Sequence, residues 1–83
     1  MRYFFDSRDG ETVVRDRNGI ECRDFDCAKH EAAKGLADLA SDVLPACTLP
    51  CKLSIEIRDE SGSCIVVIDA IIDLHVLAFR ISN

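Results

Sequence analysis

Cysteine is the residue type in this sequence that offers the most chemistry. Five cysteines occur among 83 residues, and four of them form two closely spaced pairs, Cys22-x4-Cys27 and Cys47-x3-Cys51. Thiolates are soft ligands that Zn²⁺ binds tetrahedrally, so the two pairs together could hold a structural zinc ion. Alternatively, Cys27 could act as a nucleophile at the start of a helix, with His30 as its base.

A helix predicted between the two pairs decides which of these groups can meet. Asp24 is a favourable N-cap residue, and apolar side chains then recur at helical spacing until Pro45 ends the pattern. A helix of about 20 residues is ~30 Å long, so the first cysteine pair lies at one end and the second beyond the other. One ion cannot bind both pairs.

A smaller group of metal ligands remains geometrically reasonable. Residues 52–58 alternate between apolar and polar side chains, which predicts a strand that runs back toward the start of the helix. The candidate ligands that this arrangement could bring together are Cys22, Cys27, His30 and Cys64. The alternative interpretation is that the cysteines are small buried hydrophobes and that the imidazole is exposed.

A second candidate group lies near the C-terminus, where Asp69, Asp73 and His75 share one face of a predicted strand. Two carboxylates and an imidazole could bind a divalent metal or act in acid–base chemistry. In an extended strand, however, Asp69 and His75 are ~20 Å apart at ~3.3 Å per residue. The alternative is that these side chains keep an outer face soluble.

The elements that must position these residues predict a single α+β domain over residues 1–83. The expected strands are residues 2–7, 11–15, 20–22, 52–58 and 64–79. The helical stripe consists of Phe25, Ala28, Ala32, Leu36, Leu39 and Val43. Arg-Asp-x-x-Gly occurs twice, at residues 15–19 and 58–62, and we interpret it as one strand-end turn used twice. We therefore expect a two-layer sandwich: a β-meander, one long helix and a C-terminal hairpin, with the helix on one face of a four- to five-stranded antiparallel sheet.

Composition narrows the classes of partner and the compartment. The formal net charge is −5, and no segment is basic, so nucleic acid is not an expected partner. The longest apolar run, residues 65–79, contains Asp69 and Asp73 and falls short of the ~20 apolar residues of a membrane-spanning helix. The first residues do not form a signal peptide, so we expect a cytoplasmic protein whose cysteines are free thiols.

The C-terminal strand has more apolar side chains than one helix can cover. One face carries Val66, Ile68, Ala70, Ile72, Leu74 and Val76, which can lie under the helix. The opposite face carries Ile65, Val67, Ile71, Leu77 and Phe79. Exposed apolar patches and open strand edges favour association with another chain. We therefore predict a homodimer through this strand.

Several short segments of the chain resemble a known family. They are residues 1–6, the Asp9-Gly10 turn, Asp16-x-x-Gly19-x-Glu21, residues 36–40 and residues 55–62. Together they are similar to a family of short, uncharacterised bacterial proteins that form a domain of unknown function. The resemblance extends to Gly62, supports the fold and brings no catalytic residues. The order of elements is also similar, at the level of fold, to HicB-like antitoxins.

The sequence thus favours a bacterial, non-enzymatic protein–protein interaction or regulatory module that acts as a homodimer. No catalytic residue and no cofactor is expected, and an additional protein partner is left open. Two alternatives remain: a HicB-like antitoxin-type module, and a metal-binding or thiol-dependent protein that uses the cysteine cluster.

Overall fold

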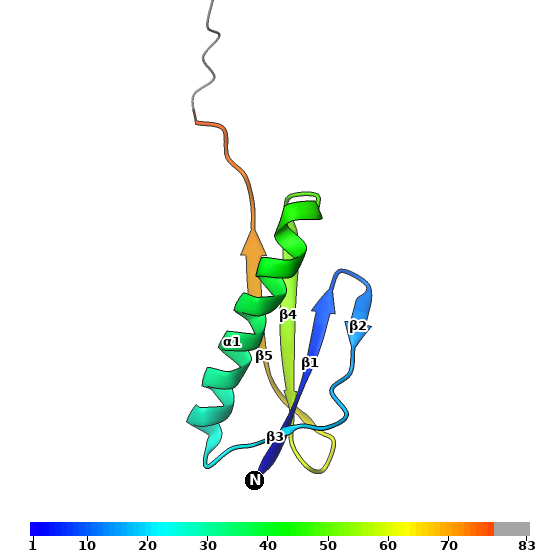
Figure 1. Cartoon of the computed structure of the whole chain (residues 1–83), viewed down its shortest axis with the longest axis vertical. Helices are drawn as coiled ribbons and strands as arrows, with labels where there is room; N and C mark the ends of the chain where they lie inside the picture. The colour runs from blue at the N-terminus through cyan, green and yellow to red at the C-terminus, as the bar shows by residue number, and fades with distance from the viewer. Residues whose placement is uncertain (78–83) are drawn as a thin grey trace, which may run out of the picture.

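The fold has two layers, an antiparallel sheet and one helix that lies across it (Figure 1). A computed structural model describes residues 1–77. In chain order its elements are β1 (Arg2–Asp9), β2 (Thr12–Val14), β3 (Ile20–Glu21), α1 (Phe25–Val43), the 3-10 turn η1 (Leu44–Ala46), β4 (Cys51–Arg58) and β5 (Cys64–Ile72). The predicted α+β class, with one long helix and five strands, is confirmed.

The sheet has the strand order β2-β1-β4-β5, and β3 pairs with the first residues of β1. β2 pairs antiparallel with the other end of β1, from Ser7 to Asp9. Because β2 and β3 are both antiparallel to β1, they run in the same direction. Residues 15–19 therefore do not reverse the chain, and β3 pairs with β1 again, in contrast to the predicted β-meander, in which it would pair with β2.

The helix packs its small side chains against the centre of the sheet. The Asp24 side chain caps it by accepting a hydrogen bond from the Cys27 amide (2.8 Å). Ala28 and Ala32 are completely buried, and their lack of bulk lets the helix lie close to β4. The buried apolar residues are Tyr3, Cys22, Ala28, Ala32, Leu53, Ile55 and Ile57.

The two Arg-Asp-x-x-Gly segments share local features, although only the second reverses the chain between paired strands. In the first, the Asp16 carboxylate accepts hydrogen bonds from the Asn18 and Gly19 amides (3.1 Å each). In the second, Asp59 accepts from the Ser61 amide (2.9 Å). Each turn ends in a glycine with positive φ, 71° at Gly19 and 88° at Gly62. A side chain at Gly19 would also collide with the carbonyl oxygen of Tyr3, at 2.9 Å from a Cβ.

A buried ion pair joins these turns to the sheet. Arg58 donates from Nε to Asp6 Oδ2 (2.6 Å) and from a terminal nitrogen to Asp6 Oδ1 (3.1 Å). The same terminal nitrogen of Arg58 also donates to the backbone carbonyl oxygen of Asp16 (3.0 Å). The backbone amide of Asp16 in turn donates to Asp6 Oδ1 (2.9 Å). Burial alone would raise the pKa of Asp6, but the hydrogen bonds from Arg58 and from the Asp16 amide lower it below its ordinary value.

The last strand is shorter than predicted and ends at Ile72. Ile72 pairs with Cys51, the first residue of β4, so no partner backbone continues beyond it. Asp73 then accepts a hydrogen bond from the Leu74 amide (2.8 Å), which competes with a strand ladder. The expectation that Leu74 and Val76 lie under the helix is therefore wrong, because both are about 70% exposed.

Replacement of the buried carboxylate tests the importance of the ion pair. Asp6→Asn places an amide NH2 or a single carbonyl oxygen where two charge-assisted bonds are now accepted, and leaves Arg58 without its counter-ion. We expect the free energy of unfolding to fall by about 1–3 kcal/mol in urea titrations. The control is Asp38→Asn on the exposed face of α1, with an expected change within about 0.5 kcal/mol. Equal effects of the two variants would contradict the role given to Asp6.

The same contacts predict how stability depends on pH. The folded-state pKa of Asp6 lies below that of the unfolded chain, near ~3.9. The stabilisation of the folded state by ionised Asp6 is therefore complete above the unfolded-state pKa. It is lost as the pH falls through the lower folded-state pKa. The difference in unfolding free energy between the wild type and Asp6→Asn should narrow as the pH is lowered from neutral into this range. A difference that stays constant or widens would show that the carboxylate is not stabilised by these contacts.

Candidate functional site

The predicted cysteine cluster is only partly assembled. Cys22 is 1% exposed in the core, and burial together with the hydrogen-bonded Cys27 thiol raises its pKa to about 11. His30 and Cys64 are exposed, and the Cys64 thiol lies 3.7 Å from the carbonyl oxygen of Val66. Within residues 1–77 no three side chains of the metal-ligating types lie close enough together to hold an ion. The structure thus brings Cys22 and Cys27 together and leaves His30 and Cys64 outside that pair.

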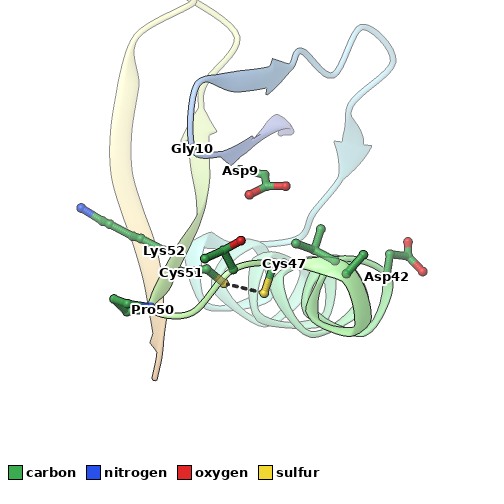
Figure 2. Close-up of a pocket in the computed structure, with 10 residues that line it drawn as sticks. Asp9, Gly10, Asp42, Cys47, Pro50, Cys51 and Lys52 are labelled. Atoms are coloured by element: carbon green, nitrogen blue, oxygen red, sulfur yellow. Dashed lines mark hydrogen bonds between the residues drawn. The ribbon is translucent and has the colours of Figure 1, made fainter. Parts of the chain in front are cut away.

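The second cysteine pair lies at the far end of the helix, as the helix length predicted. Cys47 follows η1 and Cys51 begins β4, and their sulfur atoms are 3.5 Å apart. Figure 2 shows the two sulfurs facing each other, whereas the Asp42 carboxylate points away from them. They line an open groove of about 560 Å³ that also includes Asp9. Sequence reasoning considered this pair only as half of a zinc site and did not predict the groove, although the four-residue spacing across Pro50 could have indicated a tight connection.

The acidic group near the C-terminus does not form a common site. Asp69 accepts a hydrogen bond from the Ser54 hydroxyl on β4 (2.6 Å) and lies 3.9 Å from the Lys52 ammonium. Asp73 and His75 lie beyond the end of β5 and are 3.7 Å apart. Each carboxylate thus has its own local contacts, and the regular strand that would align all three groups ends before Asp73.

The apolar outer face of β5 is present as predicted. Val66 and Ile68 pack against the core, whereas the alternate side chains of Ile65, Val67 and Ile71 point away from the helix and are 43%, 48% and 74% exposed. Of the other two residues predicted for this face, Leu77 is exposed but lies beyond the strand, and Phe79 lies outside the described residues. The surface formed by Ile65, Val67 and Ile71, together with the free backbone edge of β5, is called the β5 edge below.

The β5 edge has few of the features that normally protect an open strand. Within the described chain β5 hydrogen-bonds to a neighbour on one side only, β4. The nine residues of β5 contain neither proline nor lysine. Their single charged side chain, Asp69, accepts a hydrogen bond from Ser54 on the neighbouring strand β4. A register shift beside Arg58 leaves Ile65 without a partner on β4, so the pairing is regular only from Val66 to Ile72. In the described chain the edge from Val66 to Ile72 is therefore regular and available for pairing.

The opposite sheet edge differs in length. β2 has three residues, and the chain leaves the edge immediately after Val14. Short edge strands offer few backbone groups to a partner. This contrast makes the β5 edge the better candidate interaction surface.

No helix within the described residues is long and apolar enough to cross a membrane. No curated protein and no solved structure matches the chain. A family model described as a domain of unknown function (DUF6894) matches residues 2–71, which reaches beyond Gly62 and includes nearly all of β5. The match covers most of the chain and includes every element of the sheet. The chain therefore belongs to this family, the domain of unknown function DUF6894, in agreement with the resemblance of its N-terminal segments.

Proposed function

We propose that this chain is a small, non-enzymatic interaction module that acts as a homodimer, joined through the β5 edge. The observation that supports the proposal most directly is a nine-residue strand, regular from Val66 to Ile72, with one hydrogen-bonded neighbour in the described chain and an exposed apolar outer face. Antiparallel pairing with a second copy would satisfy the free backbone groups and cover part of that face. The sheet would then continue from one subunit into the next.

The residues of β5 favour one register for this pairing. Two-fold pairing about Ile68, the middle residue of the strand, overlaps the two strands from Cys64 to Ile72 and places Ile65, beside the register shift, opposite Ile71 on the outer face. Val67 is then opposite Asp69 of the second copy. Pairing about Asp69 would instead place two carboxylates opposite each other, which is unfavourable. We infer that the two-fold axis passes at Ile68.

The other predictions of function and compartment remain predictions. A cytoplasmic, bacterial setting and an additional protein partner are compatible with the proposal. The antitoxin-type alternative rests on the order of elements, which is an analogy of fold. The metal-binding alternative would require ligands beyond Cys22 and Cys27.

A charge on the β5 edge should separate the subunits. Val67→Asp adds a carboxylate opposite Asp69 of the second copy, twice in each dimer, and should weaken self-association by at least about tenfold, which is about 1.4 kcal/mol. The wild type is expected to be a dimer at tens of micromolar in sedimentation equilibrium. Because Val67 is half exposed, the monomeric variant should retain its circular dichroism spectrum.

Val13→Asp on β2 is the matched control, since Val13 is 43% exposed and its strand forms the other edge of the sheet. This variant should remain dimeric. A monomeric wild type would overturn the proposal. So would a dimer that is disrupted by Val13→Asp and not by Val67→Asp.

The inferred register can be tested separately. Ile65→Glu and Ile71→Lys should each weaken the wild-type homodimer, because each places a charge opposite an isoleucine. A mixture of the two variants should form heterodimers preferentially, since the new carboxylate of one chain then faces the new ammonium of the other. Native mass spectrometry of the mixture measures the proportions. A statistical mixture would contradict pairing about Ile68.

A further inference from the structure

The second cysteine pair has the geometry of a reactive dithiol. The sulfur atoms of Cys47 and Cys51 are 3.5 Å apart, close to van der Waals contact, whereas a disulfide bond is ~2.05 Å long. Cys47 lies in the extended backbone that follows η1, and Cys51 is the first residue of β4. The two cysteines are thus joined by the short connection of residues 47–51, between the end of the helix and the start of β4.

A reagent can reach this pair from the groove. Both cysteines line the groove of about 560 Å³, whose other polar lining residues are Asp9, Asp42, Thr48 and Lys52 (Figure 2). The other close pair differs in this respect, because Cys22 is buried in the core beneath the helix. Of the two pairs, Cys47 and Cys51 therefore offer the accessible dithiol.

We propose that Cys47 and Cys51 form a reversible intrachain disulfide by exchange with a small-molecule disulfide that enters this groove. The thiolate of one cysteine attacks a sulfur of the small disulfide, forms a mixed disulfide and releases one small thiolate, which takes up a proton. The thiolate of the second cysteine then attacks the protein sulfur and releases the other small thiol. The protein loses two hydrogen atoms, and one small disulfide is reduced to two thiols.

The surroundings favour a disulfide over a metal at this pair. Within residues 1–77 no third side chain of the ligating types completes a metal site with them. Burial, the neighbouring Cys47 thiol and the charge of Asp9 raise the pKa of Cys51. The dithiols of strongly oxidising proteins are stabilised in the reduced form by a thiolate, and the raised pKa of Cys51 opposes that stabilisation.

Treatment of the purified protein with glutathione disulfide tests the proposal. Trypsin releases residues 35–52 as one peptide that contains Cys47 and Cys51 and no other cysteine. After exchange this peptide should be lighter by two hydrogen atoms, carry no glutathione and resist alkylation. Dithiothreitol should restore its original mass and both alkylation sites.

Two variants make the result specific. In Cys47→Ser, attack by Cys51 cannot be followed by closure, so a glutathione adduct should persist on the peptide of residues 35–52. Cys64→Ser, which removes an exposed thiol outside the pair, should leave the intrachain disulfide unchanged. The proposal fails if the wild-type peptide stays unmodified or keeps its glutathione. It also fails if the disulfide joins the separate peptides that contain Cys22 and Cys27.

Discussion

The ion pair between Asp6 and Arg58 is the interaction on which the arrangement of the sheet most depends. It connects β1 to the end of β4, and the Arg58 guanidinium also binds the carbonyl oxygen of Asp16 in the turn between β2 and β3. Asp16 in turn accepts a hydrogen bond from the Phe5 amide (3.1 Å), at the point where β1 lacks a paired residue between β2 and β3. The interrupted edge of β1 is thus closed by side chains. Each polar group of this cluster has a partner, as low-dielectric surroundings require.

The two edges of the sheet differ in how many regular backbone groups they leave without a partner in the described chain. The β1 side ends in a short strand, a polar cluster and tight turns, whereas the β5 side ends in a nine-residue strand that is regular from Val66 to Ile72 and carries a single charge. The helix covers one face of the sheet and contributes alanines to the contact, so it lies close to β4 and leaves the outer face open. The proposed dimer follows from this asymmetry, because a second copy supplies the backbone partners and apolar contacts that the subunit itself does not.

Local sequence patterns predicted much of this fold. The Asp24 cap, the apolar stripe of α1 and the alternation of β4 each depend on neighbours a few residues away, so they could be recognised without a structure. The apolar outer face of β5 was predicted in the same way. The end of β5 could not be, because it depends on where β4 begins in space: Ile72 has Cys51 opposite it, and the next residue has no partner.

The candidate sites depend even more on contacts that are distant in sequence. The repeated Arg-Asp-x-x-Gly segments were predicted to be similar turns, but their connection through Arg58 and Asp16 joins residues 42 positions apart. The predicted cluster of Cys22, Cys27, His30 and Cys64 required Cys64 to approach the start of the helix closely. The structure instead assembles a dithiol at the other end, where the chain passes from η1 into β4.

Hydrogen–deuterium exchange at two protein concentrations tests the central claim most directly. The outward-facing amides of β5, within residues 64–72, have no hydrogen-bonded strand on that side in the described chain. If a second copy pairs there, their exchange should slow as the concentration rises from well below to well above the dissociation constant, while exchange in β2 stays the same. Equal exchange in residues 64–72 at both concentrations, or added protection confined to β2, would contradict the account.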